Sequence, residues 1–410
     1  MKRVVITGMG AVTAFGNDVE TMFQHIIDNR CAIKPITHFD TSNFKVKLAA
    51  AIDDFHGDPF FDARDFRFND RFSQFARLAS KLAYTQAKLD HHDIDRYRFG
   101  VVFGSGIGGI TSMEKAKENL DQRGPHRIFP HFIPMTILNA AAGLIAIDLQ
   151  AKGTCVPVVT GCAAGSDAIG QGYLKIKHGL LDLALVGASE ASITPLGVGG
   201  FMAMKALYEG DTINRASIPF DKERAGFVMG EGAGALILEN YEVAKRRNAP
   251  IYGELVGYGS TCDDFHITAP IADGAGIENA MRMACTDAKL EPQKIGYINA
   301  HGTSTTLNDK TEIKAIRSIF KHQNHLPFIS STKSHLGHLL GACGVIEAMI
   351  CLQALKQSII PATINLQQID PECDFNIVAI QPIKKDIDYA MSNSLGFGGH
   401  NAVLIFRKWK

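Results

Sequence analysis

The sequence lacks several features that would assign it to a specialised class of protein. No CxxC pair occurs among its 8 cysteines, which stand at positions 31, 155, 162, 262, 285, 343, 351 and 373. This scatter argues against a zinc ribbon, a dithiol redox site and a disulfide scaffold. Lys plus Arg and Asp plus Glu both total 42. No global positive field is therefore available to hold nucleic acid or an anionic membrane.

Long apolar runs are also missing. No apolar segment reaches about 18 residues without a glycine or a polar break, so we predict no membrane span. In the first segment, MKRVVITGMGAV, Thr7, Gly8 and Gly10 interrupt the apolar run too early for a signal peptide. His91, His92, His322 and His325 lie in polar segments without an organised set of ligand partners, and we expect no metal site. A reducing cytoplasm is the expected location.

What the sequence does contain is a large apolar interior, with 46% hydrophobic and 20% charged residues in a chain of 410. This length predicts two or three lobes of about 150 residues each. Strand-like runs alternate with longer helical patterns: VVITGM, FGVVFGSG, VPVVTG, LALVGA, ALILEN, YGELVGYG, IGYINAHG, PFISST and AVLIF. Such alternation predicts an α/β fold with largely buried sheets.

The same order of motifs occurs twice. FGVVFGSGIGG and then VVTGCAAGSDAIGQG in the first half match IGYINAHGTST and then ISSTKSHLGHLLGACG in the second. The pattern indicates an internal duplication, with halves at residues 1–250 and 251–410. Residues 111–151 have no counterpart in the second half, and an insertion of this kind commonly caps a site or forms a subunit contact.

A glycine-rich loop, GSGIGG at residues 104–109, matches the GxGxxG pattern of dinucleotide-binding proteins. That function also needs a second strand ending in an acid about 20 residues later. The segment MEKAKENLDQRGPHR provides a polar helix and a loop instead. We therefore interpret the loop as a pocket wall in which glycines permit close backbone packing.

Cys162 stands between the strand-like run VPVV and a predicted helix of small residues from Gly165 to Gly179. A helix N-terminus presents unpaired amides and a positive dipole, which stabilise a thiolate, so we predict a lowered thiol pKa. The small neighbours leave amides free to hold an oxyanion. The alternative is that Cys162 is simply a small core residue.

Two histidines strengthen the catalytic interpretation. His301 follows the apolar run IGYINA at the carboxyl end of a predicted strand, where sites of α/β sheets gather. His338 lies near the start of a helix, preceded by Lys333. Glu347 lies in the apolar stretch GVIEAMICL, where a carboxylate needs a partner, and Lys333 or a water would provide one. The duplication predicts that the thiol and both histidines converge.

Four motifs in this order, VVTGCAAGSDAIGQG, NAHGTST, STKSHLGHLLGACG and NSLGFGGHN, resemble the elongating β-ketoacyl-acyl carrier protein synthases, the synthase II form especially. The resemblance implies a thiolase-like fold, with two similar halves in five α-β-α-β-α layers and usually a homodimer. It also implies that Cys162 is the nucleophile and that His301 and His338 are catalytic. Lys333 and the buried acid Glu347 would support them.

The resemblance assigns further residues. Phe397 would be a mobile gate whose amide joins that of Cys162 in an oxyanion hole. Thr303 and Thr305 would hold the phosphopantetheine arm of the carrier protein, and Ile107 would line the far end of the acyl pocket near the dimer interface. Because the carrier protein is acidic in this family, a basic entrance is expected from Arg64, Arg67, Arg127 and Lys205. Phe68 departs from the pattern, since a further cation is common there.

The implied reaction is a decarboxylative Claisen condensation of an acyl-enzyme with malonyl-acyl carrier protein, the elongation step of fatty acid synthesis. The enzyme itself is expected to bind no cofactor. Two alternatives stay open: a polyketide-type ketosynthase and a non-catalytic chain-length-determining partner. The latter typically lacks the nucleophilic cysteine, so Cys162 speaks against it. A thiolase would carry a second cysteine in its last glycine-rich loop, whereas GFGGHN has none.

Overall fold

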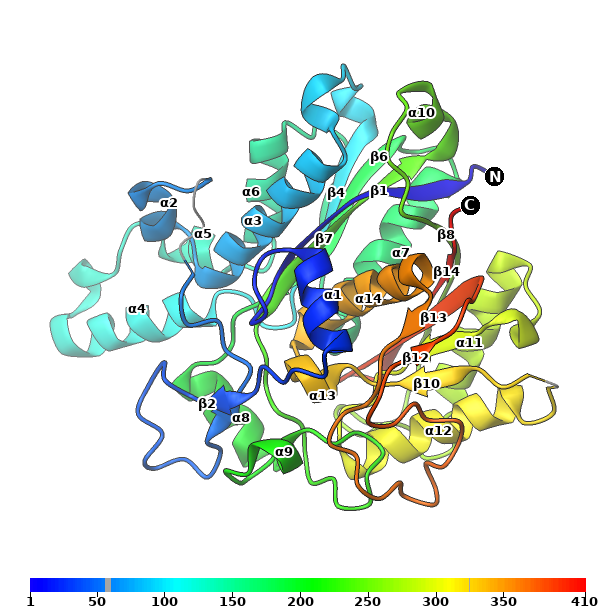
Figure 1. Ribbon diagram of the computed structural model, residues 1–410. Coiled ribbons are helices and arrows are strands. Elements are labelled where there is room, and N and C mark those ends of the chain that lie inside the picture. The colour runs from blue at the N-terminus through cyan, green and yellow to red at the C-terminus, as the bar shows by residue number, and fades with distance from the viewer. Residues whose placement is uncertain (56–59, 324) are drawn as a thin grey trace.

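The computed structural model describes Met1–Lys410 except residues 56–59 and 324, and a mixed ten-stranded sheet runs through it (Figure 1). The strand order is β10-β9-β13-β14-β8-β1-β7-β6-β4-β5. The strands are β1 (Val4–Val12), β4 (Phe99–Gly104), β5 (Cys155–Val158), β6 (Leu183–Glu190), β7 (Gly232–Asn240), β8 (Gly253–Cys262), β9 (Tyr297–Asn299), β10 (Phe328–Ser330), β13 (Tyr389–Gly396) and β14 (His400–Arg407). Two short pairs complete the set: β2 (Lys34–Pro35) with β3 (Leu48–Ala49), and β11 (Ile359–Ile360) with β12 (Ile383–Lys384).

The sheet repeats one plan on both sides of the β1–β8 pair. In the first half β5, β4 and β6 are parallel neighbours, and β7 and β1 follow antiparallel. In the second half β10, β9 and β13 are parallel, and β14 and β8 follow antiparallel. The predicted α/β fold with two pseudo-repeated halves is confirmed. We propose that the halves divide near residue 250, between α10 (Tyr241–Arg246) and β8.

Helices lie in three layers around the two half-sheets. Two buried helices, α7 (Ala164–Lys177) and α14 (Cys343–Gln357), form the middle layer between the half-sheets. The first half-sheet is covered on its outer side by α3 (Arg71–Gln86) and α6 (Ala140–Leu149), and the second by α11 (Ala275–Ala288) and α12 (Thr306–Phe320). The remaining helices are α1 (Val19–Ile27), α2 (Ala63–Phe68), α4 (Ile110–Arg123), α5 (Phe132–Thr136), α8 (Pro195–Ala203), α9 (Ile213–Ala216) and α13 (Lys333–Leu336).

The two middle helices meet at their N-terminal ends because small residues let their backbones approach. A Cβ on Gly165 would lie 2.9 Å from the amide nitrogen of Val345, and one on Gly344 would lie 2.3 Å from Oγ of Ser166. Ordinary contacts are longer, so larger residues would force the helices apart. This packing brings the start of each middle helix, and the motif before it, to the same place.

One strand departs from the expectation of largely buried sheets. β5 ends the strand order, and its residues alternate between exposed and half-buried. The local apolar pattern VPVV does not reveal that the strand lies at an edge. The inserted segment that precedes β5 forms α4, α5 and α6, and α4 projects from the body of the protein (Figure 1).

Within the described residues, one helical stretch, Leu340–Gln357, is long and apolar enough to cross a membrane by length and composition. Its mean hydropathy is 1.2, yet 89% of it is buried inside the protein. The stretch includes α14, which forms the middle layer, so its apolar surface is already covered by both halves.

Candidate active site

A cavity of about 390 Å³ opens where the two middle helices begin. It joins segments that are far apart in the chain, as the internal duplication predicts. Six of the residues singled out from the sequence as catalytic or substrate-binding line this cavity together: Cys162, His301, Thr303, Thr305, His338 and Phe397.

Cys162 lies in a single 3₁₀ turn, Gly161–Ala163, directly before α7. The position agrees with the predicted strand-to-helix junction, but the predicted thiolate does not. Burial raises the pKa of Cys162 to about 12, and the opposing effects of Lys333 and the Phe397 amide are smaller. The free enzyme therefore holds a protonated thiol at neutral pH.

This protonated thiol predicts the pH dependence of alkylation. Because the thiolate is the nucleophile, the rate at which iodoacetamide modifies Cys162 should rise about tenfold per pH unit between pH 7 and 9, without levelling. Peptide mapping by mass spectrometry at each pH measures this rate, with the exposed Cys155 as an internal comparison. A plateau near neutral pH would mean that the helix terminus does lower the pKa, as the sequence alone suggests.

His301 follows β9 and is 2% exposed. The carboxylate of Glu312, on α12, accepts hydrogen bonds from the amides of His301 at 2.8 Å and Gly302 at 2.9 Å. Asn393 donates to the same carboxylate at 3.1 Å. The hydrogen bonds to Glu312 fix the backbone at His301, and the fixed backbone positions the His301 ring.

His338 lies between α13 and the 3₁₀ turn Leu340–Ala342, and is also buried. Its ring centroid is 5.3 Å from that of His301, at an interplanar angle of 84°. Burial, with the charge of Lys333, lowers the pKa of both histidines well below the usual value. Both rings are therefore neutral, as predicted, and each has an N–H to donate.

Lys333 and Glu347 form a buried ion pair beside the histidines. Burial is the largest single effect and lowers the pKa of Lys333, but the pKa is raised overall because several opposing effects act together, with Glu347 the first among them. The ammonium therefore stays charged. Its Nζ lies 3.4 Å from Nδ1 of His301, so the same group also contacts a catalytic-site ring.

Phe397 lies in the turn between β13 and β14 and is partly exposed. Its ring faces that of Phe201, with 6.4 Å between the centroids. A hydrogen bond from its backbone is one of the effects that lower the thiol pKa of Cys162. The amide nitrogen also lies 3.4 Å from the place that a Cβ on Gly161 would take. The Phe397 amide and the Cys162 turn therefore face the same space.

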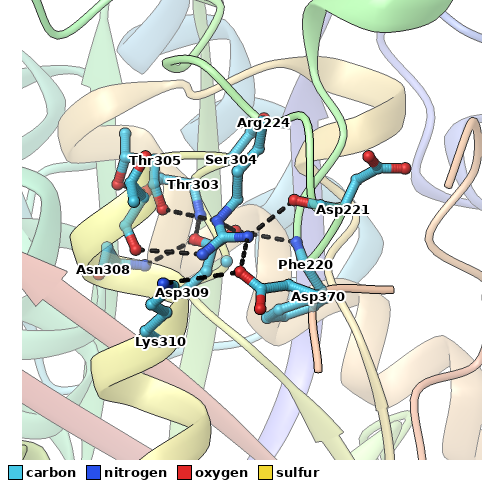
Figure 2. A network of polar contacts seen from close by, with 12 residues as sticks. Phe220, Asp221, Arg224, Thr303, Ser304, Thr305, Asn308, Asp309, Lys310 and Asp370 are labelled. Atoms are coloured by element: carbon cyan, nitrogen blue, oxygen red, sulfur yellow. Dashed lines mark hydrogen bonds and ion pairs between the residues drawn. The ribbon is translucent and has the colours of Figure 1, made fainter. Parts of the chain in front are cut away.

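Thr303 and Thr305 lie in the turn after His301, and their hydroxyl oxygens are 2.9 Å apart. The side chain of a buried arginine, Arg224, holds the main chain of this turn (Figure 2). Its guanidinium donates to the carbonyls of Thr305 and Thr306 at 3.1 Å each, and to Oδ2 of Asp370 at 2.9 Å. The hydroxyl pair thus has a rigid base.

A second carboxylate supports the same turn. Asp309, which is fully buried at the start of α12, accepts the amide of Thr303 at 2.9 Å and the amide of Phe220 at 2.9 Å (Figure 2). Its Oδ2 is also 3.5 Å from Nε of Arg224. The turn is therefore tied to the neighbouring segment from both sides.

Ile107 lies beside the cavity rather than on its wall. It packs in an apolar cluster with Cys162 and Phe201. The amides of Gly106 and Ile107 both donate to the buried carboxylate of Glu190, at 2.8 and 3.1 Å. The glycine-rich loop thus holds a buried carboxylate of the protein and packs beside the cavity, whereas the sequence predicted that it would form the pocket wall.

The four basic residues predicted to contact the carrier protein lie in two separate regions of the structure. Lys205 is exposed and lines the cavity just after α8. Arg64 and Arg67 are exposed on α2, and Arg127 is exposed in the short turn before α5. The ring centroids of Phe68, on α2, and His131 are 4.3 Å apart with the rings tilted at 41°, so α2 lies against this inserted segment.

Four polar residues that hold the site were not predicted from the sequence: Glu190, Arg224, Asp309 and Glu312. A signal existed for the last two, since they share a buried face of α12 with Ile313 and Ile316. Acids on an apolar helix face need buried partners.

No group of three or more His, Cys, Asp or Glu side chains placed to hold a metal ion occurs in the part of the chain that the structure describes.

Comparison with known proteins identifies the family. Residues 1–244 match the β-ketoacyl synthase N-terminal domain and residues 252–367 the C-terminal domain. The chain is 46% identical over 410 residues to a 3-oxoacyl-[acyl-carrier-protein] synthase 2 of Staphylococcus aureus, covering 100% of this chain and 99% of the relative. An enzyme of the same name from Synechocystis is also 46% identical over 410 residues, with the same coverage.

Solved structures agree with this relationship. A β-ketoacyl synthase from Burkholderia phymatum is 35% identical with a TM-score of 0.92, and the match covers 100% of both chains. A type II polyketide ketosynthase, solved with its acyl carrier protein and bound to a hexaketide, is 33% identical with a TM-score of 0.91, again over 100% of both chains. The chain therefore belongs to the β-ketoacyl synthase family, and it is a condensing enzyme of the acyltransferase class.

Proposed function

We propose that the protein elongates acyl chains by condensing an acyl group on Cys162 with malonyl-acyl carrier protein, as in fatty acid synthesis. The convergence of Cys162, His301 and His338 in one cavity carries this proposal. The carrier protein presents its substrates on a phosphopantetheine arm, which Thr303 and Thr305 would hydrogen-bond at the cavity wall.

The first step transfers the acyl group. The sulfur of Cys162 attacks the thioester carbonyl, and the amides of Cys162 and Phe397 stabilise the oxyanion. The bond to the pantetheine sulfur then breaks. The proton that Cys162 loses is the proton that the departing thiolate requires, so the exchange needs no net base. A thiol with a pKa of about 12 is compatible with such an exchange.

The second step forms the carbon–carbon bond. Malonyl thioester loses carbon dioxide, and the electron pair moves onto the thioester oxygen as an enolate. His301 and His338 donate hydrogen bonds to this oxygen from neutral rings. A carboxylate in the same place would repel the negative charge of the enolate. The enolate carbon attacks the acyl carbonyl on Cys162. The carbon–sulfur bond breaks, giving 3-oxoacyl carrier protein and a thiolate that takes up one proton.

Decarboxylation tests the role of the histidines. Replacing either His301 or His338 by alanine should slow carbon dioxide release from malonyl-acyl carrier protein by about 10²–10³-fold, because a donor to the developing charge is lost. Release of labelled carbon dioxide measures the rate. His335→Gln is a control, since this buried histidine contacts the backbone carbonyls of Arg30 and Ala362 instead. Unchanged rates in both alanine variants would contradict the proposal.

The exposed basic residues would meet the acidic carrier protein. Charge reversal of Lys205 or Arg67 should raise the KM for acyl-carrier protein by about fivefold at low salt, with a smaller effect at high salt because ions screen exposed charges. Steady-state kinetics at two ionic strengths measure this effect. Lys289→Glu makes the same charge change on an exposed residue at the end of α11. An equal change in KM for that control would argue against a local patch.

We further propose a homodimer in the cytoplasm. Among the described residues β5 ends the strand order, and this supports the dimer because an edge strand offers hydrogen bonds to a second copy. Apolar side chains nearby in sequence are exposed, including Ile133, Ile147 and Val159. Exposed apolar groups of this kind favour a subunit contact. Light scattering of the purified protein measures the oligomeric state.

A polyketide-type ketosynthase is the second candidate, because the fold also matches such an enzyme. The 46% identity over the whole chain to 3-oxoacyl synthases favours fatty acid elongation. Cys162 in the cavity speaks against a non-catalytic chain-length-determining partner.

A further inference from the structure

A second thiol, that of Cys343, contacts the ring of His338. Cys343 is the first residue of α14 and is 2% exposed. Its Sγ is 2.9 Å from Nδ1 of His338. The amide of Leu339 donates to the same sulfur at 3.1 Å. The cysteine therefore contacts the His338 ring at Nδ1, and it is not among the described residues that line the cavity.

The backbone around His338 leaves its ring little freedom. The His338 amide donates to the carbonyl of Val228 at 2.7 Å, and its own carbonyl accepts the amide of Gly230 at 2.8 Å. The ring packs edge-on against Phe227, with 5.0 Å between the centroids. With the ring fixed in this way, the partner of Nδ1 decides which nitrogen carries the proton.

Proton counting gives one arrangement. Burial raises the pKa of Cys343 well above its usual value, so the sulfur keeps its proton. His338 is neutral and has a single ring proton. The sulfur already accepts the amide proton of Leu339, and Nδ1 of His338 is the acceptor within reach of its S–H among the described residues. A thiol that donates to Nδ1 leaves the ring proton on Nε2.

We propose that Cys343 is a positioning residue, which donates its S–H proton to Nδ1 of His338 and so holds the ring's own proton on Nε2. The catalytic part of this inference rests on the proposed function, in which the Nε2–H group of His338 donates to the enolate oxygen. Nε2 lies on the opposite edge of the ring from the sulfur, and His338 lines the cavity together with Cys162 and His301.

Nuclear magnetic resonance of protein with ¹⁵N-labelled histidine tests the tautomer directly. Long-range proton–nitrogen correlations show which ring nitrogen carries the proton, and His338→Ala identifies the His338 signals. We expect the Nε2–H form in the wild type and in Cys343→Ser, which keeps a donor. In Cys343→Ala we expect a mixture of both tautomers, because alanine offers Nδ1 no proton.

Decarboxylation of malonyl-acyl carrier protein gives the functional readout. Cys343→Ala should lower kcat about tenfold and change KM less than twofold, because the lost interaction acts in the transition state. Cys343→Ser should stay within about threefold of the wild type. Cys351→Ala is the matched control: it removes a fully buried thiol from the same helix, and that sulfur contacts the carbonyl of Met391 instead.

The outcomes separate the two proposals. A pure Nε2–H signal in Cys343→Ala overturns the inference, as do equal losses of kcat in Cys343→Ala, Cys343→Ser and Cys351→Ala. If His338→Ala releases carbon dioxide as fast as the wild type, the catalytic role of His338 fails. In that case the resonance experiment still decides whether Cys343 sets the tautomer.

Discussion

Replacing Cys162 by alanine is expected to abolish condensation, with the rate of 3-oxoacyl product formation falling by about 10⁴-fold or more. Among the described residues that line the cavity, Cys162 is the one thiol. Without its sulfur no acyl-enzyme can form, and the enolate has no electrophile to attack. Mass spectrometry of the intact protein after mixing with acyl-carrier protein should show the added acyl mass in the wild type and none in the variant.

The same variant should still release carbon dioxide from malonyl-acyl carrier protein. His301 and His338 stay in place, and their neutral rings act on the malonyl thioester independently of the sulfur. Cys285→Ala serves as the control, since it removes a buried thiol from the core around α11 and leaves the cavity unchanged. An acyl adduct that persists in Cys162→Ala and maps to another cysteine would overturn the assignment of the nucleophile.

The sequence predicts the strands and the meeting of the catalytic residues because both depend on local signals. Apolar runs such as FGVVFG and LALVGA gave β4 and β6. The repeated motif order placed Cys162 and His338 before two equivalent helices, and the close contact of Gly165 with α14 explains why these helices start at one place. The duplication carried information about tertiary structure that single motifs lack.

Other features depend on contacts that no local pattern contains. The thiol of Cys162 is surrounded by residues from both halves, and this burial outweighs the helix terminus that the sequence suggested would lower its pKa. The carboxylate of Glu190 accepts hydrogen bonds from the amides of Gly106 and Ile107, which are 84 and 83 positions away in the chain. The exposure of β5 follows from its place at the end of the strand order.

Replacing Lys333 by methionine is expected to lower the free energy of unfolding by about 3–5 kcal/mol, since it leaves the Glu347 carboxylate buried without its cation. The penalty depends on pH. Burial raises the pKa of Glu347 in the folded protein. The loss of stability should therefore be full at high pH and should disappear as the pH falls below about 4.3, the usual pKa of glutamate, where both states are protonated. Urea unfolding at several pH values measures it.

The double variant Lys333→Met/Glu347→Leu separates stability from catalysis. Removing both charges should restore the free energy of unfolding to within about 1 kcal/mol of the wild type, because an apolar pair fills the space without a buried charge. Condensation should remain impaired, since the ammonium that contacts Nδ1 of His301 is still missing. A double variant that regains wild-type condensation would show that Lys333 serves only the fold. One that stays as unstable as the single variant would show that the lost contacts of Lys333, rather than the unpaired carboxylate, cause the destabilisation.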